Sequence, residues 1–179
     1  MKPVSEMTQI ELAAYIQSSL RGAGIDVVLS GGSAVSFYSS DQYVSKDLDL
    51  INAHFAKRRA IRLNMERIGF HEKGRYFTHG ESAFLVEFPE GPLAVGEEPV
   101  KEIHTFELAT GTLCVLSPTD CVKDRLCAYY FWNDHQGLAQ AVLVTKSQQV
   151  DLKELERWSK AQRNVEKFYM FKEQLVNSQ

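Results

Sequence analysis

The stretch that most constrains the fold of this chain is 25–51, with the sequence IDVVLSGGSAVSFYSSDQYVSKDLDLI. An apolar run at 27–29 stops at the sequence Ser-Gly-Gly-Ser, and a helix-like segment follows at 34–38. The stretch ends in DLDLI, where carboxylates alternate with large apolar residues. Successive side chains of a β-strand point to opposite faces, so Asp47 and Asp49 are expected on one face, and Leu48 and Leu50 on the other. The pattern predicts a carboxylate pair mounted on a packed core.

This carboxylate pair and the glycine-rich turn before it suggest one kind of chemistry. Two neighbouring carboxylates repel each other, and a bound divalent cation removes that repulsion. Oxygen ligands are what Mg²⁺ prefers, so Asp47 and Asp49 are candidate metal ligands. Glycines between a strand and a helix let backbone N–H groups approach a ligand, and a helix N-terminus attracts anions. Gly31, Gly32 and Ser33 are therefore candidates for binding phosphate groups beside the metal.

The combined motif, Gly32-Ser33 followed after a gap by DLDL at 47–50, resembles the signature of the polymerase β-type nucleotidyltransferase superfamily. The lead-in at 45–47 is similar to small prokaryotic members that include the toxins of abortive-infection and toxin–antitoxin systems. The resemblance covers the first half of the chain well and the C-terminal part loosely. It implies an enzyme dependent on Mg²⁺, or on Mn²⁺ in its place, that moves a nucleoside monophosphate from a triphosphate such as ATP to a hydroxyl. The acceptor is left open between RNA or tRNA, a protein and a small molecule. For a toxin, a cognate antitoxin would be a further partner.

The resemblance also implies roles for residues outside the motif. In that superfamily a third acidic residue lies on a later strand beside the Asp pair, and Glu87 is the match, although Asp is more usual there. The alternative for Glu87 is an exposed residue of an alternating strand. Lys123 matches a lysine that points at the triphosphate, with Arg125 as the other choice and a solvated lysine as the plain alternative. Lys46 completes the expected nucleotide-binding set.

Hydrophobic periodicity predicts an α/β (α+β) fold, and the resemblance implies the nucleotidyltransferase-type mixed sheet with flanking helices. We expect a core over 1–116 and a helical region packed on it over 117–179. Thr8 and Glu11 form a capping-box pattern at the start of the first helix, and Asn52 is expected to cap a helix that ends near 67. Strands are expected at 25–29, 47–51, 75–78 and 83–88, followed by a hairpin of 103–108 and 112–116. Ser117 and the proline after it predict the next helix start.

Composition narrows the function classes. The net charge of −3 over 179 residues argues against broad, electrostatically driven nucleic-acid binding. Cys114, Cys121 and Cys127 have no metal-like spacing and are interpreted as reduced thiols. The sequence shows neither an apolar signal region at its start nor an apolar run of membrane-spanning length. We therefore expect a cytoplasmic protein with no membrane partner.

Two other interpretations compete with the enzyme. The first is a catalytically inactive nucleotidyltransferase-like module that binds a nucleotide or a protein. The second is a structural role for Asp47 and Asp49, with Asp49 paired to a basic side chain. The intact Asp pair and Gly-Ser turn favour the enzyme, because degenerate members of the superfamily usually lose an acidic residue.

Overall fold

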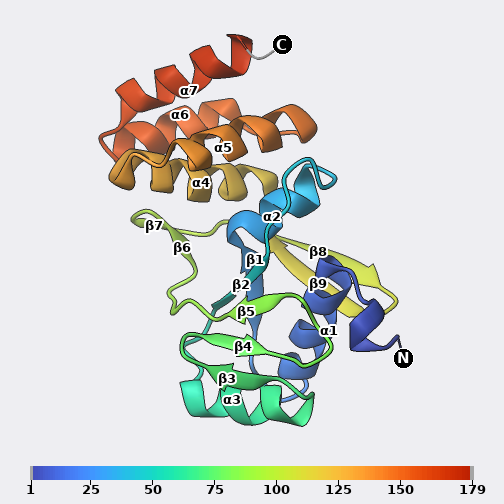
Figure 1. Cartoon of the computed structure of the whole chain (residues 1–179). Helices are drawn as coiled ribbons and strands as arrows, with labels where there is room; N and C mark the ends of the chain where they lie inside the picture. Colours follow the sequence, from blue (N-terminus) through green and yellow to red (C-terminus); the bar gives the residue numbers. More distant parts are fainter. Residues whose placement is uncertain (1, 178–179) are drawn as a thin grey trace.

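The computed structural model describes residues 2–177, and within them a mixed β-sheet carries the fold (Figure 1). Its strands are β1 (Val27–Ser30), β2 (Asp47–Asn52), β3 (His71–Lys73), β4 (Tyr76–Thr78), β5 (Leu85–Glu87), β8 (Ile103–Leu108) and β9 (Gly111–Leu116). The order across the sheet is β3-β4-β5-β2-β1-β9-β8. β2 runs parallel to β5 and β1 parallel to β9, whereas the other neighbours are antiparallel. A small hairpin of β6 (Ala94–Val95) and β7 (Glu98–Pro99) lies outside this sheet.

The helices divide between the two ends of the molecule. They are α1 (Gln9–Arg21), α2 (Gly31–Tyr38), α3 (Arg58–Arg67), α4 (Pro118–Trp132), α5 (His135–Ser147), α6 (Leu152–Ala161) and α7 (Val165–Asn177), after a short 3-10 turn, Val4–Glu6. Figure 1 shows α4 to α7 stacked at one end, with α1 and α3 against the sheet at the other. α2 lies between the sheet and the stack, in contact with β1, β2, α4 and α5. The predicted α/β fold with a mixed sheet and flanking helices is confirmed.

Two predicted helix starts are present with their capping groups. The Thr8 hydroxyl accepts a hydrogen bond from the Glu11 N–H at 3.3 Å, and the Glu11 carboxylate accepts one from the Thr8 N–H at 2.8 Å. The Ser117 hydroxyl likewise accepts from the Asp120 N–H at 3.2 Å, with Pro118 as the first residue of α4. Each cap satisfies a backbone donor that the helix itself leaves unpaired.

Two local predictions differ from the structure. Asn52 does not cap a helix; it ends β2, and its side chain makes hydrogen bonds of 2.7 and 2.9 Å with the backbone of Ala56. α3 begins later, at Arg58, so the Asn52 prediction is wrong because the asparagine closes a loop instead. α2 begins earlier than predicted, at Gly31, so Gly31, Gly32 and Ser33 form its first turn rather than a loop before it.

The alternation in β2 anchors the site in the core. Leu48 and Leu50 are fully buried, and Asp47 and Asp49 on the opposite face are partly exposed. Burial of each leucine contributes about 1.5–3 kcal/mol, which fixes the face on which the aspartates stand. The three cysteines are free thiols. Over the part of the chain that the structure describes, the helices are all too short or too polar to cross a membrane.

Candidate functional site

Three acidic residues lie on one face of the sheet where β2 and β5 run side by side. The register of this parallel pair places Asp49 opposite Glu87 and Asp47 opposite Leu85. Neighbouring strands are about 4.8 Å apart, and residues in register share a face, so Asp49 and Glu87 are lateral neighbours. Asp47 lies two residues along the same face of β2. We refer to Asp47, Asp49 and Glu87 as the carboxylate site.

The first turn of α2 lies directly against Asp49. Ser30, at the end of β1, is the register partner of Asp49, and the next residue, Gly31, has a φ of +62°. A Cβ at Gly31 would lie 2.1 Å from Oδ2 of Asp49, closer than any real contact allows. Glycine is therefore required here both for its backbone conformation and for space. The sequence Ser-Gly-Gly-Ser brings the N-terminus of α2 up to a carboxylate.

The surroundings of Asp49 work against its negative charge. Burial raises the pKa of Asp49 to about 6, the charge of Arg125 opposes that shift, and the charges of Glu87, Asp124 and Asp47 add to it. Desolvation and like charges both disfavour an ionised carboxylate. The site is thus an accumulation of negative charge that the neighbouring side chains do not fully compensate.

Carboxylates in such an arrangement have the donor chemistry for a hard divalent cation. All three offer oxygen ligands, which Mg²⁺ and Mn²⁺ prefer, and a cation would relieve the repulsion around Asp49. Within residues 2–177, however, no group of three or more His, Cys, Asp or Glu side chains is already arranged to hold a metal ion. Glu87 is engaged elsewhere, because its Oε2 lies 3.5 Å from Nε of Arg75. The chemistry of the donors fits, and ligation by all three carboxylates would require their side chains to rearrange.

Comparison with solved structures identifies the fold. A nucleotidyltransferase-like antigenic protein from Paracoccidioides brasiliensis aligns with a TM-score of 0.56 and 12% identity, over 76% of this chain and 75% of its own. ANT(2″)-Ia in complex with adenylyl-2″-tobramycin aligns with a TM-score of 0.52 and 15% identity, over 96% and 99% of the two chains. The solution structure of this antibiotic-resistance factor gives 0.53 and 15%, over 92% and 95%. The chain has a nucleotidyltransferase-type fold. No protein-family model and no curated protein matches its sequence.

In this nucleotidyltransferase-type fold three of the expected phosphate-binding residues, Gly31, Gly32 and Ser33, form the first turn of α2. Ser33 is fully buried, and its hydroxyl donates to the carbonyl of Ser30 at 3.1 Å. Gly31 and Gly32 are buried in the same turn. Lys46 is exposed immediately before β2. Their roles in binding a nucleotide stay predictions.

The structure engages Lys123 in an ion-pair network and brings other residues of α4 to the carboxylate site. Lys123 is only 3% exposed, and its Nζ lies 3.0 Å from both Asp120 and Glu154. Arg125 instead acts on Asp49 and is held by Asp124 at 2.6 Å and Gln140 at 3.3 Å. The predicted contact of Lys123 with a triphosphate stays a prediction, and it would require breaking two buried ion pairs. Arg125 is the cation of α4 whose charge acts on the carboxylate site.

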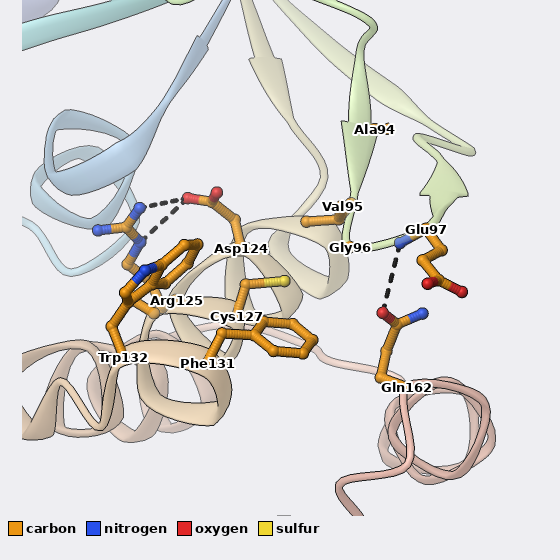
Figure 2. A pocket seen from close by; sticks show the side chains of 11 residues that line it. Ala94, Val95, Gly96, Glu97, Asp124, Arg125, Cys127, Phe131, Trp132 and Gln162 are labelled. Carbon is orange, nitrogen blue, oxygen red and sulfur yellow. Dashed lines mark hydrogen bonds and ion pairs between the residues drawn. The ribbon is translucent and has the colours of Figure 1, made fainter.

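A cavity of about 450 Å³ lies between α4 and the β6–β7 hairpin (Figure 2). Asp124 and Arg125 line this cavity, and the charges of the same two residues act on Asp49. The cavity therefore shares two charged residues with the surroundings of the carboxylate site. Figure 2 shows the rings of Phe131 and Trp132 on α4, across from the hairpin. Trp132 is 76% exposed, which is unusual for so large an apolar side chain. The cavity combines aromatic surface with a few charged groups, as small-molecule sites usually do.

The last helices hold the hairpin side of this cavity in place. The indole N–H of Trp158 donates to the carbonyl of Val95 at 3.2 Å, and the Glu97 N–H donates to the side chain of Gln162 at 3.3 Å. Sequence reasoning missed the cavity, because strands of two residues leave no periodic signal. The tandem aromatic residues Phe131 and Trp132 at the end of a helix were the one available sign.

Proposed function

We propose that this chain is a Mg²⁺-dependent nucleotidyltransferase that moves a nucleoside monophosphate from a nucleoside triphosphate to a hydroxyl group. The observation that carries the proposal is the juxtaposition of Asp49, its neighbour Glu87 and the first turn of α2 at Gly31. It puts a carboxylate whose ionised form is disfavoured, a second carboxylate beside it in register, and a helix N-terminus next to one another. Phosphates and a divalent cation together satisfy both, since each neutralises the charge of the other.

In the proposed reaction the acceptor oxygen attacks the α-phosphorus, the bond to the bridging oxygen breaks, and pyrophosphate leaves. Asp47 and Asp49, joined by Glu87, would hold the cation, and a carboxylate of the site takes up the proton that the hydroxyl loses. The cation would supply charge neutralisation at the triphosphate and a lowered pKa of the attacking hydroxyl. The backbone of Gly31 and Gly32 would orient the phosphates, so alignment and electrostatics do most of the work.

For the acceptor, we propose a small molecule bound in the cavity beside α4. A volume of about 450 Å³ suits a ligand of drug-like size. The exposed ring of Trp132 offers a stacking surface, Glu97 offers a carboxylate, and Asp124 and Arg125 offer an ion pair. The solved ANT(2″)-Ia complex, with its adenylylated tobramycin, supports a small hydroxyl-bearing acceptor for a chain of this fold. RNA or tRNA and protein acceptors, and a toxin role with an antitoxin partner, are the competing versions. We place the activity in the cytoplasm, where triphosphates and Mg²⁺ are abundant.

The test is transfer of label from each α-³²P-labelled nucleoside triphosphate in the presence of MgCl₂. Three acceptor pools are offered separately: lysate metabolites below about 1 kDa, total RNA, and lysate protein. We expect Mg²⁺-dependent label in the metabolite pool, and none with the Asp49→Asn variant. Label in RNA or protein would instead assign a macromolecular acceptor. Calorimetric binding of Mg²⁺-nucleotide without label in any pool would favour the inactive binding module, and neither binding nor label would refute the proposal.

A further inference from the structure

Arg75 lies where it can act on the carboxylate site without belonging to it. It follows Gly74 in the tight turn between β3 and β4, and its neighbour Tyr76 is the register partner of Glu87. Nε of Arg75 lies 3.5 Å from Oε2 of Glu87. The charges of Glu87 and Asp47 both favour its protonated form, after the larger effect of a hydrogen bond to the Tyr76 hydroxyl, and together these raise the pKa of Arg75.

The turn that carries Arg75 is anchored, whereas the side chain is exposed. Its backbone carbonyl accepts a hydrogen bond of 3.0 Å from Arg58, which in turn pairs with Glu72 at 2.7 Å. The Arg75 guanidinium lies 4.7 Å from the centre of the Tyr76 ring, and the side chain is 68% exposed. Such a side chain can exchange one partner for another at little cost, because exposed ion pairs are worth only about 0–1 kcal/mol.

We propose that Arg75 is an internal counter-ion that holds Glu87 while the carboxylate site lacks a metal, and that transfers to the phosphates of the nucleotide when the metal enters. This inference rests on the proposed function. A guanidinium and a divalent cation repel each other, so the Glu87 carboxylate cannot bind both of them tightly at the same time. The 3.5 Å ion pair gives Glu87 a cationic partner, and the described side chains form no ready three-carboxylate cluster.

The exchange makes metal and nucleotide binding cooperative. A triphosphate draws the Arg75 guanidinium away, since arginine binds phosphate in a bidentate, charge-assisted manner. Glu87 is then released to the metal, so nucleotide raises the affinity for metal. By linkage, metal raises the affinity for nucleotide by the same factor. The protein would therefore bind free metal weakly and metal with nucleotide strongly.

The test measures Mn²⁺ binding through the electron paramagnetic resonance signal of free Mn²⁺, with and without a non-hydrolysable triphosphate analogue. For Arg75→Gln we expect metal affinity without nucleotide to rise at least threefold. The factor by which the analogue enhances metal binding should fall to below half of its wild-type value. The control is Lys73→Gln, which removes a positive charge from the same hairpin at an exposed position. It should change both quantities less than twofold.

The possible outcomes distinguish a failure of the role of Arg75 from a failure of the proposed nucleotidyltransferase function. Measurable Mn²⁺ binding that is the same in wild type and Arg75→Gln, with unchanged nucleotide enhancement, overturns the role of Arg75 and leaves the proposed function standing. Higher metal affinity with unchanged enhancement also overturns it, because simple charge repulsion then explains the result. Absence of Mn²⁺ binding in every variant, with or without the analogue, overturns both.

Discussion

Two clusters of charged side chains in this molecule differ in how far their charges are balanced. The carboxylate site on β2 and β5 gathers negative charge, and Asp49 has its pKa raised to about 6 by burial and by like charges. The second cluster, which we name the helix ion network, ties α4 and β7 to α6, and consists of Glu98, Asp120, Lys123, Glu154 and Arg157. In the network each carboxylate has a cationic partner. At the carboxylate site the neighbouring side chains do not fully balance the negative charge, so a bound cation can. In the helix ion network the side chains balance one another's charges.

Glu154 shows the contrast most directly. It accepts hydrogen bonds from Arg157 at 2.7 Å, Lys101 at 2.6 Å and Lys123 at 3.0 Å. These partners, Arg157 foremost, hold the pKa of Glu154 well below its usual range. The shift of Asp49 has the opposite sign although both residues are carboxylates at partly buried positions. The raised pKa of Asp49, opposite in sign to that of a fully paired carboxylate, is therefore the stronger indication of a functional site.

The largest expected effect is on catalysis. Asp49→Asn removes one donor and one charge from the carboxylate site, and we expect nucleotidyl transfer to fall by about three orders of magnitude or more, equivalent to about 4 kcal/mol. The fold should persist, because the amide occupies the same space. Initial rates of labelled transfer and a far-ultraviolet circular dichroism spectrum check the two parts. Activity within tenfold of wild type would remove Asp49 from the reaction.

The next effect belongs to the helix ion network. Glu154→Gln leaves the buried Lys123 with Asp120 alone, and we expect the free energy of unfolding to fall by about 3 kcal/mol, as for broken buried ion pairs. Urea unfolding at pH 7.5 measures it. The control Glu156→Gln removes a carboxylate on the same helix whose partner, Lys160, is exposed. It should cost less than about 0.5 kcal/mol. Equal losses in both variants would contradict the contrast between the two clusters.

The pH dependence of stability should show the sign of the pKa shift at the carboxylate site. The pKa of Asp49 is about 6 in the folded chain and near 4 when unfolded, so the folded state binds the extra proton between those values. Stability relative to Asp49→Asn should therefore fall as pH rises from about 4 to 6.5 and stay level above. The expected fall is about 2 kcal/mol, allowing for partial exposure. Urea midpoints across this range test it, and a rise in relative stability would refute the environment assigned to Asp49.

The smallest effect comes from a matched pair of half-buried glutamates, each beside an arginine. Glu87 is 24% exposed and pairs with Arg75, and Glu98 is 25% exposed and pairs with Arg157. Glu87→Gln should weaken Mn²⁺-nucleotide binding about tenfold, or about 1.4 kcal/mol, with little change in stability. Glu98→Gln should cost about 1 kcal/mol of stability and leave metal binding unchanged. Calorimetry of Mn²⁺-nucleotide binding and urea unfolding on both variants test this. Weaker metal binding in Glu98→Gln, or a loss of stability without weaker binding in Glu87→Gln, would contradict it.

Sequence patterns were sufficient where the determinants are local. Alternation in DLDLI placed Leu48 in the core and Asp49 on the open face, and alternation at 83–88 put Glu87 on a strand. That the two strands pair in this register depends on the whole sheet. Lys123 and Arg125 differ by two positions on one helix, and both form ion pairs, Lys123 with Asp120 and Glu154 and Arg125 with Asp124. Only the tertiary structure brings Glu154 of α6 to Lys123 and the charge of Arg125 to Asp49. The prediction for Asn52 was wrong for a related reason, because an asparagine that caps a helix and one that closes a loop look alike in the local sequence.

The attachment of the β6–β7 hairpin to Trp158 and Gln162 has a consequence for the order of assembly during synthesis. Chains leave the ribosome from the N-terminus at about 5–20 residues per second, so the strands bearing Asp49 and Glu87 emerge seconds before α6 does. Until then Val95 and Glu97 lack the partners that fix their position. A nascent chain can thus carry Asp49 and Glu87 while the hairpin side of the proposed acceptor cavity still lacks its hydrogen-bond partners. The order of synthesis therefore delivers the strands of the carboxylate site before the helix that holds the hairpin in place.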